Sequence, residues 1–123
     1  MTLPLFVFGA LRTGGGAAHL LGTRTRRPAT AGGRLWLLAS GAPLFVPGPS
    51  DRVHGDLVDG VEPGLLTLLD RMEGVLEGVV RRVEVDVRVG LRTQRATTWV
   101  GTVERARAGR PVAGGRWTPI KVR

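Results

Sequence analysis

The stretch Leu5-Phe-Val-Phe-Gly-Ala-Leu-Arg-Thr-Gly14 decides most of what the sequence says about the fold. The residues from Leu3 to Phe8 are apolar on both faces, which predicts a fully buried strand. The strand stops at Gly9, where glycine allows a sharp turn and a close approach of the backbone to a ligand. Successive N–H groups in such a turn form a small anion-binding concavity. A buried strand that ends in glycine is also common in β proteins that lack any such site.

The segment from Glu62 to Met72 is the one convincing helix in the chain. Pro63 suits the first helical position, and Gly74 suits the left-handed conformation that ends a helix. Apolar residues recur at helical spacing between these two signals, namely Leu65, Leu66, Leu68, Leu69 and Met72. The pattern therefore predicts an amphipathic helix with one apolar face.

Glu73, the last residue before this glycine, falls inside the apolar arc at about 100° per residue, whereas Asp70 and Arg71 fall outside it. A carboxylate on an apolar face must find a partner or hold a proton. Desolvation and the negative end of the helix dipole both disfavour its ionisation, so we predict a raised pKa for Glu73. Such a group accepts and returns a proton near neutral pH. In the alternative, Glu73 bends to the surface or pairs with an arginine such as Arg82.

The other segments predict an α+β domain with about six short strands, one main helix and a strongly curved sheet or barrel. Strands are expected at 34–39, 42–46, 53–58, 83–89 and 96–103, with a helical turn at 17–21. Strand 83–89 alternates valine with charged residues, as a half-buried strand does. Residues 24–33 and 47–51 are expected to be connections. Residues 1–123 are expected to form one domain, with an irregular segment from about residue 104.

The composition excludes several classes of function. The chain has no cysteine, which rules out disulfides and thiolate chemistry and makes the cytoplasm the expected location. It has neither an apolar run long enough for a membrane span nor the basic start of a signal peptide. The net charge is +8, and Lys121 is the only lysine. Nucleic-acid binding is nevertheless not expected, because the arginines are spread along the chain and match a GC-rich coding bias.

Other familiar sites receive little support from the sequence. His19 and His54 are isolated, so no metal site is expected. Ser40 and Ser50 do not lie in the turn that presents a nucleophilic serine. The glycines at 14–16 lack the lysine and hydroxyl residue that complete a phosphate-binding loop.

Taken together, these residues resemble the γ-glutamylcyclotransferase-like family, including its γ-glutamylamine-type and plant AIG2-like branches. The family carries a Tyr-Gly-Thr/Ser-Leu turn after its first strand, which Phe8-Gly9-Ala10-Leu11 matches. It carries Leu-Asp-x-x-Glu-Gly at a helix end, matched by residues 69–74, and a Tyr-x-Arg-x-x-Val-x-Val strand, matched by residues 80–87. Weaker similarities are at Gly33-Arg34-Leu35, Pro43, residues 53–57, Trp99 and Gly115-Arg116-Trp117.

The resemblance implies a small mixed β-barrel with a cavity at its mouth and an intramolecular reaction. The α-amine of a γ-glutamyl group attacks its own γ-carbonyl, which yields 5-oxoproline and a free amine or amino acid. By this resemblance Glu73 is the acid/base, and the N–H groups of Gly9, Ala10 and Leu11 hold the substrate's carboxylate or carbonyl oxygen. The expected partner is a small γ-glutamyl compound, with no metal and no cofactor.

Three positions depart from the family pattern. Phe8 and Val80 stand where the family has tyrosines, and Ala10 stands where it has a hydroxyl residue. The backbone donors survive these changes, but the expected pocket loses polar contacts. Arg12 and Arg82 are candidates to replace them by pairing with a substrate carboxylate. The alternative function is that of a catalytically weak or inactive member of the same fold that binds a small metabolite.

Overall fold

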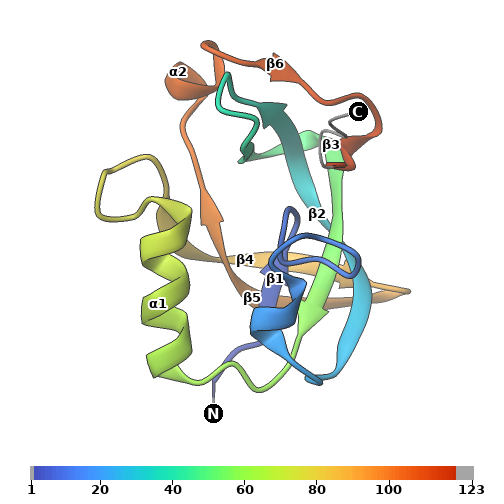
Figure 1. Cartoon of the computed structure of the whole chain (residues 1–123). Coiled ribbons are helices and arrows are strands. Elements are labelled where there is room, and N and C mark those ends of the chain that lie inside the picture. The colour runs from blue at the N-terminus through green and yellow to red at the C-terminus, as the bar shows by residue number, and fades with distance from the viewer. Residues whose placement is uncertain (1, 119–123) are drawn as a thin grey trace.

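The computed structural model describes residues 2–118, which form a closed mixed barrel with one main helix beside it (Figure 1). Five strands make the barrel in the order β3-β1-β5-β4-β2, and β2 pairs back with β3 to close it. A further short strand, β6, pairs with β2 outside the ring. The strand bounds are β1 Leu5–Val7, β2 Arg26–Leu37, β3 Pro43–Val58, β4 Arg81–Val89, β5 Arg92–Val100 and β6 Arg110–Pro111. The predicted α+β barrel with one main helix is confirmed.

The shortest barrel strand, β1, determines where the functional turn lies. It runs antiparallel to β3, with Phe6 opposite Leu57, and parallel to β5, with Leu5 opposite Thr97. Both faces of β1 are buried, as the apolar run predicted. The strand is shorter than the expected 3–8, and the turn after it emerges at one end of the barrel.

The core has two layers, one on each face of the barrel wall. Inside the barrel the rings of Phe6, Phe8 and Phe45 pack together, with ring centroids 5.6 to 6.2 Å apart. Outside the barrel a second layer includes Leu5 and Val7, which alternate with the phenylalanines along β1. This alternation follows from the two-residue period of a strand.

The main helix, α1 (Pro63–Glu73), covers this outer layer (Figure 1). Pro63 lies in its first turn, and Gly74 ends it with φ of 95°, as predicted. Leu69 is fully buried, and Leu65 and Leu66 are half-buried against the barrel. Leu68 and Met72, which the apolar arc included, are 47% and 53% exposed. The helix therefore packs through a narrower arc, centred near the direction of Glu73.

Two predicted connections proved to be strand. Residues 24–33 were expected to be a polar connection, but Arg26 onward belongs to β2 because β3 pairs with it residue by residue. The segments 42–46 and 53–58 are likewise one strand, β3. The register shifts between Gly32, opposite Arg52, and Gly33, opposite Pro47. Residues 48–51 of the predicted loop are thus a bulge without partners on β2.

The half-buried strand predicted at 83–89 is confirmed as part of β4, whose charged residues Glu84, Asp86 and Arg88 are exposed. Its predicted partner, 96–103, is displaced, since β5 begins at Arg92 directly after the turn at Gly90. The remaining elements are short, namely 3-10 helices at Ala18–Leu21 and Ala113–Gly115 and α2 at Val103–Ala106. Among the described residues, no helix has the length and apolar character needed to cross a membrane.

Candidate active site

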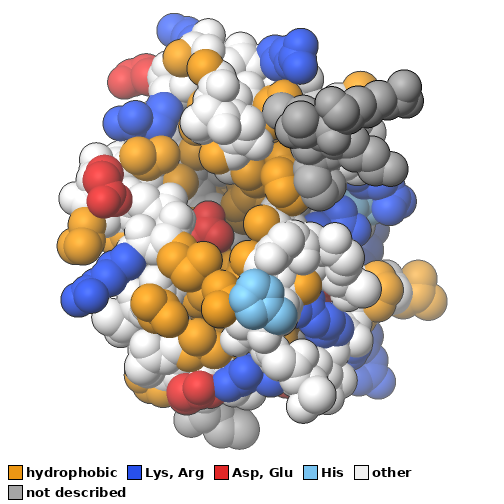
Figure 2. All heavy atoms as spheres, viewed as in Figure 1, with side chains coloured by type: hydrophobic (Ala, Val, Ile, Leu, Met, Phe, Trp, Pro, Cys, Tyr) orange, Lys and Arg blue, Asp and Glu red, His pale blue; other side chains and the backbone are white. Residues whose placement is uncertain are grey.

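A cavity of about 350 Å³ opens between the turn after β1, the C-terminal end of α1 and the start of β3. Figure 2 shows a hollow rimmed by hydrophobic side chains on the face that carries α1. The cavity brings Glu73 together with four predicted site residues, Phe8, Gly9, Ala10 and Leu11. Its other lining residues are Val7, Ala17, Ser40, Gly41, Ala42, Pro43, Met72, Trp99 and Trp117. A volume of this size suits a small metabolite.

Glu73 is the only charged residue that lines this cavity among the described residues. Its carboxyl group is largely buried, and burial raises its pKa to about 7, as predicted from the helix pattern. Within residues 2–118 no side chain forms a hydrogen bond or ion pair with it; Arg82, the partner suggested in the alternative, pairs with Asp70 at 3.0 Å. Glu73 therefore titrates near neutral pH beside an apolar space.

Backbone hydrogen bonds within the turn after β1 fix its conformation. Arg12 N–H donates to the Gly9 carbonyl at 3.0 Å, and Ala17 N–H donates to the Ala10 carbonyl at 2.9 Å. A Cβ at Gly9 would lie 2.7 Å from Pro43 Cγ, so glycine is needed for the turn to pack against β3. Within the described part of the chain, the N–H groups of Gly9, Ala10 and Leu11 have no acceptor. All three residues line the cavity.

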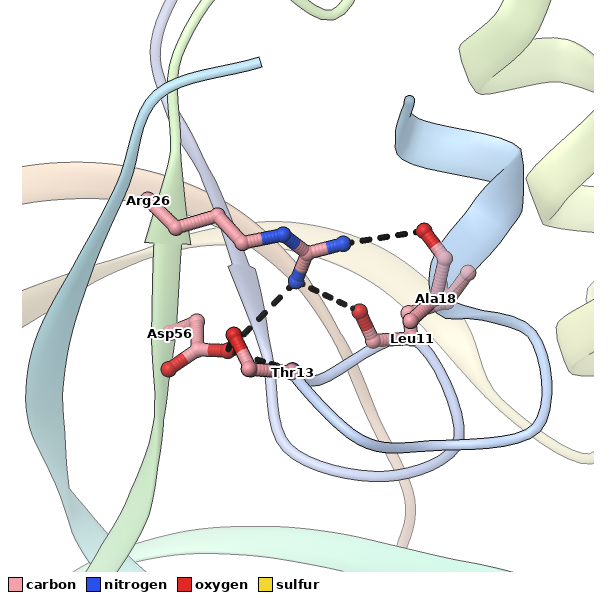
Figure 3. Close-up of polar contacts among 5 residues, drawn as sticks. All are labelled: Leu11, Thr13, Ala18, Arg26 and Asp56. Atoms are coloured by element: carbon pink, nitrogen blue, oxygen red, sulfur yellow. Dashed lines mark hydrogen bonds and ion pairs between the residues drawn. The ribbon is translucent and has the colours of Figure 1, made fainter. Parts of the chain in front are cut away.

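A partly buried polar cluster anchors this turn to the barrel (Figure 3). The Asp56 carboxylate, on β3, accepts hydrogen bonds from Thr13 N–H at 2.8 Å and Thr13 Oγ1 at 3.0 Å. Arg26, on β2, lies 3.4 Å from the same Asp56 oxygen and donates to the carbonyls of Leu11 at 2.8 Å and Ala18 at 3.0 Å. These bonds tie the turn to the two neighbouring strands and fix its position.

Two tryptophans from distant parts of the chain form the aromatic wall of the cavity. Trp99 Nε1 donates to Asp70 Oδ1 at 2.8 Å, one turn before Glu73 on α1. Trp117 Nε1 donates to the Gly41 carbonyl at 3.3 Å. Each indole is therefore fixed by its polar edge while its apolar ring faces the cavity residues.

Three residues expected to bind substrate do not line this cavity. Arg82 lies on the exposed face of β4, where the Asp70 carboxylate holds it. Val80 is buried in the outer layer of the core. Arg12 follows the turn but lines a different cavity, beside His54. Arg82 is turned away by its place on the exposed face of β4, and Val80 and Arg12 by the packing around them, which the motif alone does not specify.

The sequence patterns did not predict several of the residues that line this cavity. Ser40, the only hydroxyl residue among the described lining residues, had been set aside because its surroundings do not suit a nucleophile. Pro43, Trp99 and Trp117 appeared only as weaker family similarities. The two tryptophans could have been singled out from the sequence, since the chain has only three. No group of three potential metal ligands occurs among residues 2–118.

The closed barrel and its cavity define the class of protein, that of the γ-glutamyl cyclotransferase-like folds. The chain belongs to the family described as Gamma-glutamyl cyclotransferase, AIG2-like, whose family model matches residues 5–119. The predicted family is thus confirmed. No curated protein sequence matches the chain significantly.

Solved structures show the same fold at low sequence identity. An AIG2-like protein from Mus musculus is 15% identical, with a TM-score of 0.74 and 98% of each chain covered. YkqA from Bacillus subtilis is 21% identical with a TM-score of 0.74, and the match covers 95% of this chain but only 40% of YkqA. A solved gamma-glutamyl cyclotransferase is 19% identical, with a TM-score of 0.66 and coverage of 83% and 68%.

Proposed function

We propose that this protein is a γ-glutamyl cyclotransferase that releases 5-oxoproline and a free amine or amino acid from a small γ-glutamyl compound. One observation supports this most strongly. Glu73, with its pKa raised to about 7 by burial, lines the same cavity as the unpaired backbone donors of Gly9, Ala10 and Leu11. An acid/base and an oxyanion-binding turn on one cavity are the two parts that this reaction requires.

In the proposed reaction the Glu73 carboxylate takes a proton from the substrate's α-ammonium group. The freed amine attacks the γ-carbonyl carbon, a new C–N bond closes the five-membered ring, and the negative charge moves to the carbonyl oxygen. When the carbonyl reforms, the bond to the leaving nitrogen breaks, and Glu73 returns its proton to that nitrogen. The ring nitrogen still carries an extra proton after the attack, and Glu73 takes this second proton and passes it to the released amine. Of the three ammonium protons, one stays on the ring nitrogen and two depart with the amine as ammonium.

The backbone donors at Gly9–Leu11 would stabilise the negative charge that develops on the carbonyl oxygen, or bind the glutamyl carboxylate. They are held rigidly by the bonds of Asp56 and Arg26 to the turn, so little reorganisation is needed during the reaction. The nucleophile and the carbonyl belong to one molecule, so their orientation also lowers the barrier, and the proposed chemistry requires no cofactor. With no cysteine, the chain suits the reducing cytoplasm, where we expect it to act.

The test is to incubate the protein with γ-glutamyl amines and γ-glutamyl amino acids and to measure 5-oxoproline by chromatography. Glu73→Gln keeps the size of the side chain but removes the titratable carboxyl group, and we expect it to lower the rate at least 100-fold. Glu77→Gln is the matched control, because Glu77 is exposed beyond the end of α1 and should retain full activity. Equal activity of Glu73→Gln and the parent protein would refute the assigned role.

One observation favours a second function, the binding of a small metabolite without turnover. Ser40 provides the only side-chain hydroxyl in the described cavity lining, and Phe8 and Ala10 provide none. The same panel of compounds separates the two functions. A ligand-dependent rise in melting temperature without any 5-oxoproline would support binding alone, whereas turnover would exclude it.

A further inference from the structure

A second cavity, of about 390 Å³, lies on the other side of the turn after β1 and shares no lining residue with the cavity of Glu73. It gathers basic side chains from four separate segments: Arg12 after β1, His54 on β3, Arg88 on β4 and Arg116 near the C-terminal end of the described chain. Figure 2 shows basic side chains along the edge of the molecule where β2 and β3 run.

The arginines of this cavity differ from the paired arginines elsewhere in the barrel. Within residues 2–118, Arg12, Arg88 and Arg116 form no ion pair. The single acid in the lining, Asp56, is already bonded to Thr13 and paired with Arg26. Three guanidinium groups therefore face one concave space without a free carboxylate to neutralise them.

Two local features favour the binding of an anion in this space. The Nε–H of Arg12 is buried and has no acceptor among the described residues, which is an unfavourable state for a charged donor. The pKa of His54 is lowered, first by burial and then by the charges of Arg116, Arg12 and Arg52. An oxyanion in the cavity would accept from Arg12 and offset this accumulation of positive charge.

The fold fixes the backbone positions that carry these basic residues. Thr30 on β2 lies opposite His54 on one side and opposite Arg88 on the other. Arg52 donates to Thr30 Oγ1 at 2.7 Å and to its carbonyl at 3.2 Å. The segment before Arg116 packs closely onto β3, because a Cβ at Gly115 would collide with the carbonyl oxygen of Arg52. The site is thus built from fixed elements and not from one flexible loop.

We propose that this second cavity binds the phosphate group of a small phosphorylated compound. Arginine forks match the geometry of phosphate oxygens, and a dianion best balances three unpaired guanidinium groups. A cavity of this volume accommodates a small metabolite. His54 is the only aromatic side chain among its described lining residues, so the site offers little for stacking nucleobases, which single-stranded nucleic acids require.

The experiment is calorimetric titration of the full chain with inorganic phosphate and with glycerol phosphate at low ionic strength. We expect saturable binding of both, weakened about tenfold by Arg88→Gln and by Arg12→Gln. Arg107→Gln is the matched control, because Arg107 is exposed after α2 and lines neither cavity. In parallel, NMR titration should show that phosphate raises the pKa of His54, since a nearby anion favours the charged imidazole.

Three results would overturn the proposal. The first is absence of saturable phosphate binding at millimolar concentration. The second is an equal loss of affinity in Arg107→Gln and Arg88→Gln, which would indicate diffuse attraction to a basic surface. The third is tight binding of a single-stranded oligonucleotide by a protein that does not bind phosphate or glycerol phosphate. None of these readouts depends on cyclotransferase activity, so this proposal and the proposed function can fail separately.

Discussion

Asp70 accepts a 2.8 Å hydrogen bond from Trp99 Nε1 and so links α1 to the aromatic wall of the cavity that Glu73 lines. The other oxygen of Asp70 pairs with Arg82 at 3.0 Å. The two acids of the Leu-Asp-x-x-Glu-Gly motif are only three residues apart but have different environments. Asp70 has partners on both oxygens, whereas Glu73 has none among the described side chains and is tuned toward neutrality by burial.

The Asp70 contacts predict a measurable loss of stability on truncation. Asp70→Ala leaves the indole N–H of Trp99 and the Arg82 guanidinium without their acceptor, and we expect it to lower the free energy of unfolding by about 1–3 kcal/mol. Urea denaturation measures this change. Asp86→Ala is the control, because its ion pair with Arg95 is exposed and its loss should lower stability by no more than about 0.5 kcal/mol. Similar losses in both variants would show that the Trp99 contact contributes little.

The raised pKa of Glu73 predicts that the stability of the protein falls with rising pH. The folded state holds the proton up to about pH 7, whereas the unfolded chain releases it near the ordinary glutamate pKa of 4.5. The contribution of Glu73 to the free energy of unfolding should therefore be highest below pH 4.5 and should decrease until about pH 7. Glu73→Gln stays neutral, so above pH 7 it should exceed the parent protein by at most about 3 kcal/mol.

Denaturation of both proteins at pH 4.5 and pH 8 measures this difference. Glu77→Gln again serves as the control, because Glu77 is exposed and does not line the cavity. A constant difference between Glu73→Gln and the parent protein at both pH values would contradict the raised pKa.

The same titration predicts the pH dependence of turnover. As a base, Glu73 must be ionised in the free enzyme, so kcat/KM should fall about tenfold for each pH unit below about 7 and level off above it. Initial rates of 5-oxoproline release between pH 5 and 8.5 measure this decrease in kcat/KM. A midpoint near 4.5 would mean that an ordinary, solvated carboxylate controls the reaction.

The contact between Gly9 and Pro43 predicts that the turn tolerates no side chain at its first position. In Gly9→Ala the new Cβ would lie 2.7 Å from Pro43 Cγ and force the turn away from β3. We expect a loss of about 1–3 kcal/mol in stability and at least a tenfold loss of kcat/KM, because the backbone donors move with the turn.

Gly16→Ala is the matched control for this substitution. Nothing lies within 4 Å of a Cβ at Gly16, and its φ is not in the left-handed region. Steady-state kinetics and thermal unfolding of both variants provide the comparison. Near-normal activity of Gly9→Ala would show that the position of the turn is unimportant for turnover.

The local parts of the fold and of the candidate site were predictable from neighbouring residues. Pro63 and Gly74 delimit α1 because capping chemistry acts within one helical turn. The direction of Glu73 follows from helical periodicity alone, and its burial then accounts for the raised pKa. The alternation of β4 likewise predicted which of its side chains remain in solvent.

The strand pairings and the full wall of the cavity were not predictable in this way. Residues 26–33 resemble a polar connection, and only pairing with β3 makes them part of a strand. Asp70 lies outside the apolar arc, yet Trp99, from the other end of the chain, reaches it. Arg12, Val80 and Arg82 match or adjoin family motifs, but none of them lines the cavity of Glu73.

By itself, then, the sequence determined where the helix begins and ends, which acid lies on its buried side, and where the first strand turns. The tertiary structure alone decided how the strands close into a barrel, which distant side chains wall the cavity, and which arginines gather on the other side of the turn. The physical reason is the separation along the chain of the residues that interact. Helix periodicity and capping depend on residues a few positions apart, whereas barrel closure and side-chain partners depend on contacts between residues far apart in the chain.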